Sequence, residues 1–352
     1  MPKPILISGI QPTGKLHIGN YLGALKNFVD LQNTGRYQCY FFIADLHALT
    51  ENPKAKDLSV NIANLAADFL AAGIDPEKST VFIQSKISAH SELMWVLNTI
   101  TPMGELKRMT QFKDKAKTLS KIKTSCGEMY ADKKSLIFDE DSTVIANIGL
   151  FDYPVLQAAD ILLYKAEIVP VGEDQLQHLE LARALARKFN NKFGKIFLEP
   201  KSILTKAPRL MSLDDPSKKM SKSRPAGCLF LDDSPEVIRG KIKKATTDSG
   251  REIKYDFRNK PAISNLMTIY SAFSGQPLES IEKRFKNKSY GDFKKELAEV
   301  VIADLKPFQE RKKQWEKQSS KIKIILKNGA QKANRVSQAT MAEVKKKIGL
   351  IY

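Results

Sequence analysis

Short apolar runs alternate with amphipathic stretches near the start of the chain. The runs at 4–10, 39–44 and 79–84 are short and continuous, which is typical of buried strands. The intervening stretches at 17–32 and 56–72 carry apolar side chains at spacings of three and four, as one face of a helix does. This strand–helix–strand–helix–strand order predicts an α/β fold with a parallel, doubly wound sheet of the Rossmann type.

The α/β pattern continues farther along, after an interruption. Residues 116–147 show weak periodicity and mixed charge, so we interpret them as an insertion over the sheet. A helical stretch at 152–164, an apolar run at 168–171 and a long helical stretch from 173 to about 189 then resume the alternation. Together these segments predict a first domain over residues 1–209.

The last third of the chain is basic and helical. Its strand pattern nearly vanishes, and four stretches predict helices with lysines on their outer faces: 234–248, 261–275, 291–327 and 329–348. We therefore predict a helical domain over residues 210–352. The whole chain has 57 Lys+Arg against 39 Asp+Glu, a formal net charge of +18. That excess favours a nucleic acid as partner, although lysine used as surface filler is the alternative.

Cysteine usage and hydropathy indicate the compartment. Cys39, Cys126 and Cys228 lie far apart, so neither a zinc site nor a disulfide framework is predicted. The sequence has no apolar run long enough to span a membrane, and its first residues pass directly into the first predicted strand. We expect a cytoplasmic protein.

A glycine-rich turn follows the first predicted strand. The sequence SGIQPTGKLHIGNYLGA at 8–24 comprises a strand end, a turn and the start of a helix. Ligands of parallel sheets bind at the carboxyl ends of strands, where backbone N–H groups favour phosphate. His17 and Asn20 lie one turn apart, so both can reach a bound phosphate or ribose. A turn with an ordinary capping residue is the alternative interpretation.

A lysine-rich segment lies about 200 residues later, at 216–224, and reads PSKKMSKSR. Taken alone, such a run is typical of a solvated surface loop. If it faces a nucleotide instead, Lys219, Ser221 and Lys222 can surround a triphosphate and stabilise pyrophosphate as it leaves. HIGN and KMSKS together are a much rarer pair than either motif alone.

The two motifs resemble the signature sequences of class I aminoacyl-tRNA synthetases. Seven stretches are similar, in order, to the bacterial tryptophanyl-tRNA synthetase family, and they cover nearly the whole chain outside the insertion: 8–25, 44–50, 104–115, 149–164, 168–183, 211–223 and 260–275. The resemblance implies a class I synthetase catalytic domain followed by a helical domain that binds the tRNA anticodon region.

The resemblance also implies which residues bind ATP. They are Gln11, Pro12, Thr13, Gly19, Asn20, Gly172, Glu173, Asp174, Leu210, Lys219, Met220, Ser221, Lys222 and Ser223. The residues implied to act in catalysis are His17, Asn20, Lys115, Lys219, Ser221 and Lys222. Lys115 matches a further phosphate-binding lysine. Lys218 and Arg224 are expected to be ordinary surface charges.

For tryptophan, the resemblance implies that Asp160 accepts the indole N–H. Tyr153 and Gln175 match the pair that binds the α-amino group, while the pocket walls match His47, Val169, Val171, Gln157 and Ile7. Family members often have Met in place of Gln157 and Phe in place of Ile7, so the packing of this pocket is expected to differ. Without the family, Asp160 would be interpreted as a surface carboxylate of a helix and His47 as a satisfied loop histidine.

The implied activity is ATP-dependent activation of L-tryptophan and its transfer to tRNA(Trp) by a homodimer. Magnesium is expected on the substrate phosphates, and no protein metal site is predicted. The tyrosine enzyme is the nearest alternative, although GEDQ at 172–175 and AADIL at 158–162 favour tryptophan. The same fold could also belong to a non-catalytic RNA-binding paralogue or to a small-molecule nucleotidyltransferase.

Overall fold

The computed structural model describes residues 2–109, 147–204, 208–222 and 224–350. Two candidate residues, Lys115 and Ser223, lie outside these described residues. The predicted insertion also lies outside them, apart from its last residue.

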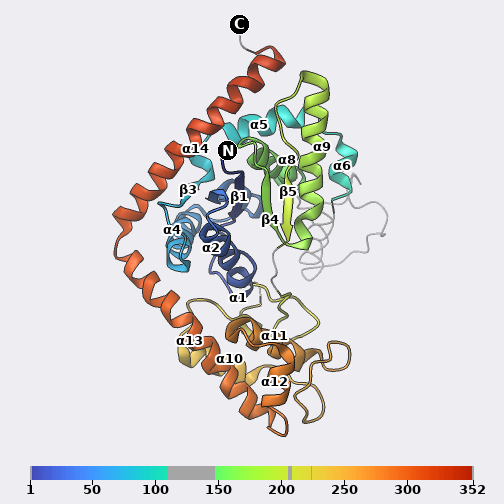
Figure 1. The fold of residues 1–352 in the computed structure, drawn as a ribbon, viewed down its shortest axis with the longest axis vertical. Coiled ribbons are helices and arrows are strands. Elements are labelled where there is room, and N and C mark those ends of the chain that lie inside the picture. The colour runs from blue at the N-terminus through green and yellow to red at the C-terminus, as the bar shows by residue number, and fades with distance from the viewer. Residues whose placement is uncertain (1, 110–146, 205–207, 223, 351–352) are drawn as a thin grey trace, which may run out of the picture.

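A five-stranded parallel sheet forms the centre of the larger lobe (Figure 1). Its strands are β1 Ile5–Ile10, β2 Gln38–Ile43, β3 Ser79–Ile83, β4 Ile168–Val171 and β5 Lys201–Leu204. The order across the sheet is β3-β2-β1-β4-β5, and neighbouring strands are parallel throughout. This confirms the doubly wound topology. The sequence pattern does not predict β5, because this edge strand begins with Lys201 and Ser202 and is only partly buried.

Helices cover both faces of the sheet and continue into a smaller lobe. The longer ones are α2 Lys26–Asn33, α4 Ala55–Ala72, α5 Ala89–Asn98, α8 Ile148–Leu162, α9 Leu176–Phe193, α10 Pro235–Lys244, α11 Pro261–Ser274, α13 Tyr290–Glu316 and α14 Ser319–Ile348. Short helices and single turns are α1 Ile18–Asn20, η1 Tyr21–Leu25, α3 Asp45–Ala48, η2 Leu49–Glu51, η3 Gln84–Lys86, α6 Met103–Lys107, η4 Glu173–Gln175, η5 Pro225–Gly227 and α12 Leu278–Arg284. The sequence pattern predicts α4, α8 and α9 but not α5, α6 or α12.

Successive strand residues enter two different cores. Leu6 and Phe41 pack in one core with α2 and α4, while Ile7 and Phe42 pack in the other with α5, α8 and α9. This alternation follows from the strand geometry, which turns neighbouring side chains to opposite faces. The first core continues into the C-terminal helices, where Phe293 belongs to the same apolar cluster. The two lobes therefore share one hydrophobic core.

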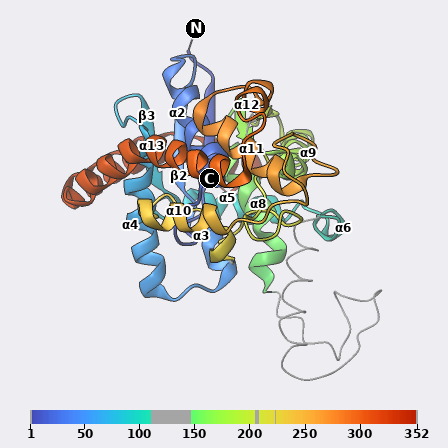
Figure 2. The same ribbon diagram turned by 90° about the horizontal axis from the view of Figure 1, so that it is seen from below.

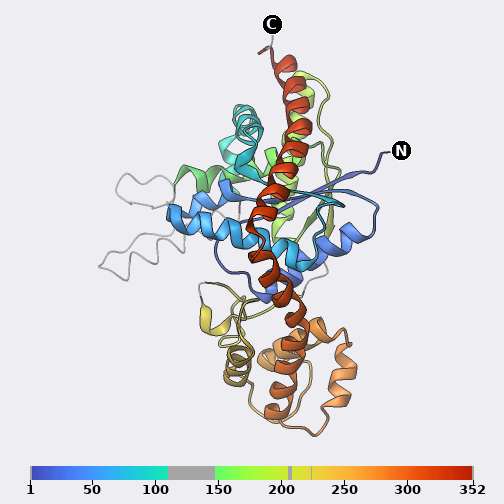
Figure 3. The same ribbon diagram turned by 90° about the vertical axis from the view of Figure 1, so that its left-hand side faces the viewer.

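The last two helices join the lobes. α10, α11 and α12 form the smaller lobe with the first part of α13, and they lie nearest the viewer when the molecule is seen from below (Figure 2). α13 packs against α4, and α14 then runs along the larger lobe beside β3 and α5 (Figure 3). The division into domains at residue 209 stays a prediction.

The predicted helix break before residue 329 is wrong, because α13 ends at Glu316 and α14 begins at Ser319. Asn328 and Gly329 together resemble a helix stop signal but lie inside α14. A Cβ atom at Gly329 would lie 1.8 Å from the carbonyl oxygen of Val81 in strand β3. This glycine lets the helix approach and cover the edge strand, which would otherwise be exposed to pairing.

Replacing Gly329 with alanine is expected to destabilise the protein. Because the new methyl group would meet backbone rather than a movable side chain, the free energy of unfolding should fall by about 1–3 kcal/mol. Gly240→Ala on α10 is the matched control, since its Cβ would enter open space and alanine should add up to about 1 kcal/mol. Denaturant unfolding followed by circular dichroism measures both variants. Equal stability of the two would contradict the close approach.

Candidate functional site for a nucleotide and an amino acid

The order of strands reverses between β1 and β4, the centre of the sheet. These two strands are direct neighbours, with Leu6 opposite Ile168. Helices leave neighbouring strands in opposite directions at such a point, which opens a crevice outside the carboxyl ends. The glycine-rich turn follows β1 there, and Gly172 to Gln175 follow β4. The fold thus brings the two predicted nucleotide-binding segments to one edge.

His17 caps the helical segment that follows the turn. Its Nδ1 accepts a hydrogen bond from the Gly19 N–H at 3.0 Å, and Asn20 Oδ1 accepts the His17 N–H at 3.2 Å. Since Nδ1 is an acceptor, Nε2 carries the ring proton. Burial, followed by the charges of Lys222 and Lys219, lowers the pKa of His17 to about 4. The imidazole is therefore a neutral N–H donor near neutral pH.

Residues 218–220 form the return of a short hairpin, with Lys219 opposite Met211. The N–H of Met220 donates to the Leu210 carbonyl at 3.0 Å, and that of Ser212 donates to the Lys218 carbonyl at 2.8 Å. Met220 is buried, whereas Lys219 is exposed. Met220 thus anchors a loop in which Lys218 and Lys219 face outward.

Two basic side chains of this loop, those of Lys218 and Arg224, pair with the carboxylate of Asp215. Lys218 lies 2.9 Å from Asp215, and Arg224 lies 3.4 Å from the same carboxylate. Exposed pairs of this kind contribute little to stability. Their geometry agrees with the prediction that Lys218 and Arg224 are surface charges.

Lys222 connects the loop with the glycine-rich turn. Its Nζ lies 3.3 Å from both Thr13 Oγ1 and the Gly14 carbonyl oxygen, across 209 and 208 residues of sequence. Burial lowers the pKa of Lys222 from its ordinary value. The next segment of the chain pairs with the turn as well, since the Ile18 N–H donates to the Leu229 carbonyl at 2.9 Å. The structure therefore brings Lys222 to the turn that immediately precedes HIGN, as a shared phosphate site requires.

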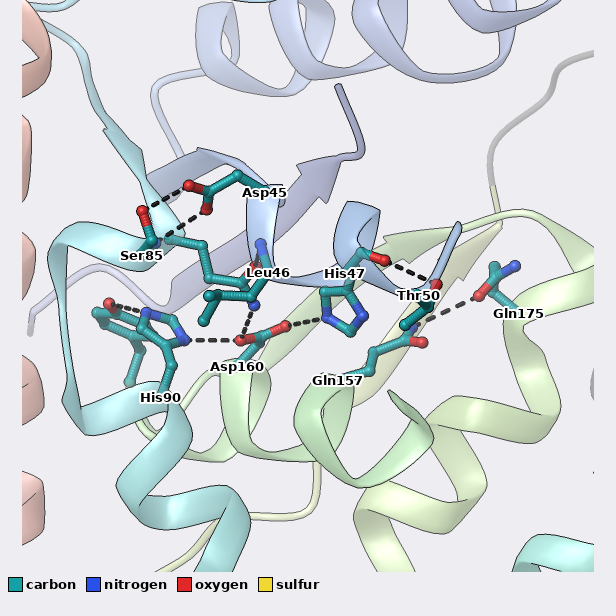
Figure 4. A network of polar contacts seen from close by, with 11 residues as sticks. Asp45, Leu46, His47, Thr50, Ser85, His90, Gln157, Asp160 and Gln175 are labelled. Carbon is teal, nitrogen blue, oxygen red and sulfur yellow. Dashed lines mark hydrogen bonds and ion pairs between the residues drawn. The ribbon is translucent and has the colours of Figure 1, made fainter. Parts of the chain in front are cut away.

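Asp160 lies in the interior of the larger lobe, so its interpretation as a surface carboxylate is wrong. Only 1% of the residue is exposed. Three side chains surround its carboxylate (Figure 4): His47 Nε2 is 2.7 Å from Oδ2, while Gln84 Nε2 and His90 Nδ1 lie 2.7 and 2.6 Å from Oδ1. Burial opposes the negative charge, but the hydrogen bonds from His47 and His90 outweigh it and lower the pKa of Asp160 to about 2. Asp160 is consequently an ionised acceptor.

The sequence does not point to Gln84 or His90. Gln84 is the last residue of a predicted strand and His90 belongs to a helix that the pattern does not predict, so neither carries a local signal. His47 is buried on the short helix α3 and is satisfied by Asp160, not by its own loop.

Most of the remaining predicted pocket residues belong to the apolar cluster that also contains Ala159 and Ile161, the neighbours of Asp160 on α8. Ile7, Val169 and Val171 are buried, and Tyr153 Oη lies 2.7 Å from His178 Nε2. Gln157 Nε2 points toward Gln175 Oε1 at 3.5 Å, from one turn before Asp160 on α8 (Figure 4). The sequence departure at position 157 thus places an amide beside the predicted amino-group ligand.

The described residues hold neither a metal-binding cluster nor a membrane-spanning helix. None of their His, Cys, Asp and Glu side chains form a group of three or more that could hold a metal ion. Within the same ranges, no helix has the length and apolar character needed to cross a membrane.

The chain matches the family model for class I tRNA synthetases of the tryptophan and tyrosine type over residues 2–306. A curated tryptophan–tRNA ligase from Caldanaerobacter subterraneus is 47% identical over 349 residues, which is 98% of each chain. The chain belongs to the tryptophanyl-tRNA synthetase family. Because the curated relative is a tryptophan enzyme along its whole length, the tyrosine alternative is not supported.

Solved structures agree with this family. The tryptophanyl-tRNA synthetase of Mycoplasma pneumoniae has a TM-score of 0.84 at 34% identity and covers 99% of this chain and 98% of its own. The Campylobacter jejuni enzyme, complexed with ADP and tryptophan, has a TM-score of 0.76 at 36% identity, with coverage of 98% and 99%. Over the described residues, this synthetase therefore shares the fold of these relatives, including the C-terminal helices.

Proposed function

We propose that this synthetase is a tryptophan–tRNA ligase whose chemistry takes place at the carboxyl edge of β1 and β4. It joins L-tryptophan to ATP, forming tryptophanyl-adenylate and pyrophosphate, and then transfers tryptophan to the 3′ end of tRNA(Trp), releasing AMP. The observation that carries the amino-acid assignment is the buried, ionised Asp160 with its three donors.

The geometry of the Asp160 carboxylate supports a fourth hydrogen-bond donor in addition to His47, Gln84 and His90. An ionised carboxylate offers about four lone-pair positions, two on each oxygen. Oδ1 already faces Gln84 and His90, whereas Oδ2 faces His47. The second position of Oδ2 suits the indole N–H. Phenylalanine would leave that position unpaired, and a site built to pair a polar group rejects analogues that lack it by about 10⁴–10⁵.

The remaining tryptophan contacts follow the family pattern. Tyr153 and Gln175 would hold the α-amino group, and Ile7, Val169 and Val171 would pack against the ring. Gln157 is close enough to Gln175 to orient its amide.

ATP would be bound by two segments at the carboxyl edge of the sheet, the glycine-rich turn after β1 and residues 172–175 after β4, each contacting a different part of the nucleotide. Gly172, Glu173 and Asp174 would hold ribose and adenine together with the Leu210 backbone, while Gln11, Thr13, Gly19 and Asn20 would contact the phosphates. His17 would donate from Nε2, and Lys219, Ser221 and Lys222 would bind the leaving pyrophosphate. Lys115 and Ser223 complete the proposed set.

The reaction consists of two displacements without an enzyme nucleophile. The tryptophan carboxylate attacks the α-phosphorus of ATP while pyrophosphate departs, and the terminal adenosine hydroxyl of the tRNA then takes the aminoacyl group and displaces AMP. Positioning and charge stabilisation therefore carry the catalysis. Magnesium, when bound, would neutralise phosphate charge, with the substrate phosphates as its main ligands. Lys222 already contacts the turn before HIGN, and the loop that carries it would close over ATP and reopen to release pyrophosphate.

The tRNA would bind along the basic C-terminal helices. Lys321, Lys323, Lys327 and Lys332 are all exposed on α14. Exposed lysines neutralise phosphates without reading sequence, so binding should weaken steeply as salt rises. Because tRNA is the substrate, we place the enzyme in the cytoplasm.

The activity is tested by ATP–pyrophosphate exchange and by charging of a tRNA(Trp) transcript. Tryptophan should support both, and tyrosine neither. Exchange that requires no tRNA partner and yields no charged product would indicate a nucleotidyltransferase. An absence of exchange would indicate a non-catalytic paralogue.

We further propose a homodimer formed through the apolar face around η2 and the start of α8. Leu49 and Ile148 there are 51% and 77% exposed, beside a cavity of about 300 Å³ lined by Leu46, Met94 and Gly149 among others. Large exposed apolar groups beside a hollow are typical of protein interfaces. A second copy would bury them.

An Ile148→Asp/Leu49→Asp double variant is expected to shift this synthetase toward the monomer, since each charge would be desolvated in the interface. Analytical ultracentrifugation measures the shift. Leu198→Asp, at an exposed leucine in the loop after α9, should leave the dimer intact. A monomeric wild type, or a dimeric double variant, would contradict the proposed face.

A further inference from the structure

His90 is a fully buried histidine with a polar partner on each ring nitrogen. Nδ1 lies 2.6 Å from Asp160 Oδ1, and Nε2 lies 2.9 Å from the hydroxyl oxygen of Tyr164. It comes from α5, whereas Asp160 belongs to α8, 70 residues away in sequence. No motif of the nucleotide or amino-acid site includes it.

The direction of these hydrogen bonds follows from the carboxylate. Asp160 is ionised and can only accept, so the nitrogen that faces it must carry a proton. With Nδ1–H donating to Asp160, Nε2 is left to accept from the Tyr164 hydroxyl. Burial raises the pKa of Tyr164 above its ordinary range, so this hydroxyl keeps its proton. Tyr164 thus donates to His90, and His90 donates to Asp160.

Gln84 is oriented in a similar way. Its Oε1 accepts the backbone N–H of Leu46 at 3.2 Å, which turns its Nε2 toward Asp160 Oδ1 at 2.7 Å. A backbone group therefore decides the orientation of this amide. Gln84 and His90 thus occupy both lone-pair positions of Oδ1. Each of these donors is itself oriented by a further group, the Leu46 N–H for Gln84 and the Tyr164 hydroxyl for His90.

We infer that His90, supported by Tyr164 and together with Gln84, is a positioning residue that fixes the Asp160 carboxylate and so determines the preference for an amino acid whose ring carries an N–H donor. This rests on the proposed role of Asp160. The two donors saturate Oδ1 and prevent the carboxylate from rotating, which leaves the remaining lone pair on Oδ2 for the substrate. Without them, either oxygen could turn toward the remaining donor, and the acceptor would no longer have a fixed position.

Two substitutions at position 90 separate this role from simple packing. The amide nitrogen of asparagine can occupy the place of Nδ1, so His90→Asn keeps a donor for Asp160. The longer glutamine places its amide near Nε2, so His90→Gln keeps a polar group beside Tyr164 but withdraws the donor from Asp160. Both variants introduce an amide into the same buried space, which makes them matched controls.

The measurement is kcat/KM in ATP–pyrophosphate exchange with L-tryptophan and with β-(3-benzothienyl)alanine, in which sulfur replaces the ring N–H. His90→Gln should lower the preference for tryptophan by about tenfold or more, mainly through the KM for tryptophan, with the KM for ATP unchanged. His90→Asn should keep a preference close to that of the wild type. Tyr164→Phe should reduce the preference less than His90→Gln, because the ring remains but loses the hydroxyl that selects its tautomer.

Several outcomes overturn the inference. An unchanged preference in His90→Gln, or equal losses with both substrates in both variants, would mean that His90 only fills space. A wild type that exchanges with tryptophan but does not distinguish the benzothienyl analogue would overturn the role of Asp160 itself, and a wild type without exchange would overturn the proposed activity.

A second measurement needs no variant. Nitrogen-15 NMR of histidine-labelled wild type, which has four histidines, should show His90 protonated at Nδ1. A neutral His90 that carries its only proton on Nε2 would contradict the inference, even if the substituted proteins fail to fold.

Discussion

Asp160→Ala is expected to lower kcat/KM for tryptophan by about 10²–10⁴-fold, because removing one partner of a buried charged network costs about 3–5 kcal/mol. The substitution removes the acceptor proposed for the indole N–H. It also leaves the donors of His47, Gln84 and His90 without their partner in the interior. ATP–pyrophosphate exchange measures the loss, and the same assay with phenylalanine should show that discrimination disappears.

A control on the same helix tests whether the carboxylate itself matters. Asp152 lies on α8 as well, but it is only partly buried and accepts one hydrogen bond, from Asn98 at 2.7 Å. Asp152→Ala should therefore retain most of the activity. Similar small losses in both variants would mean that Asp160 has no special role in the tryptophan pocket. Thermal unfolding of the two proteins separates lost activity from lost structure.

The sequence predicts the centre of this fold well and its edges poorly. β1 to β4 are buried apolar runs, so hydrophobicity alone marks them. β5 lies at the edge and needs fewer apolar residues. The largest error in the helices comes from Gly329, a residue type that breaks many helices but here is required by the backbone of Val81, a strand residue far away in sequence. Contacts of this kind are set by tertiary packing and have no local signature.

In the candidate site, too, the sequence predicts individual motifs but not the contacts that the fold makes between them. HIGN and KMSKS can be recognised because the residues of each motif lie close together in the sequence. How near the two motifs lie to each other in space is not encoded locally. In the fold, Lys222 joins KMSKS to Thr13, in the turn before HIGN. The family resemblance points to Asp160, but it does not point to Gln84 and His90, which contact its carboxylate. His90 belongs to a helix without a clear pattern, and its function depends on two partners, Asp160 and Tyr164, from a distant part of the sequence.

Lys222→Ala is expected to slow adenylate formation by about 10²–10³-fold, the usual loss when one preorganised group that stabilises developing charge is removed. Lys222 is half-buried at the glycine-rich turn, so its ammonium group is already in place before pyrophosphate develops its charge. In the proposed mechanism tryptophan lies on the other side of the α-phosphorus, so its affinity should be nearly intact. Pre-steady-state measurement of adenylate formation, with tryptophan affinity determined by calorimetry, separates the two effects.

Lys218→Ala is the matched control for this prediction, because it removes the same charge from the same loop. Lys218 is exposed and pairs with Asp215 at 2.9 Å, so its loss should change the rate little. If both variants slowed the reaction equally, the effect would come from the general positive potential of the loop. If Lys222→Ala weakened tryptophan binding instead, its assignment to pyrophosphate would be wrong. Of Lys218 and Lys222, the proposed mechanism requires a rate effect only at Lys222, because only this one reaches the turn at the carboxyl end of β1.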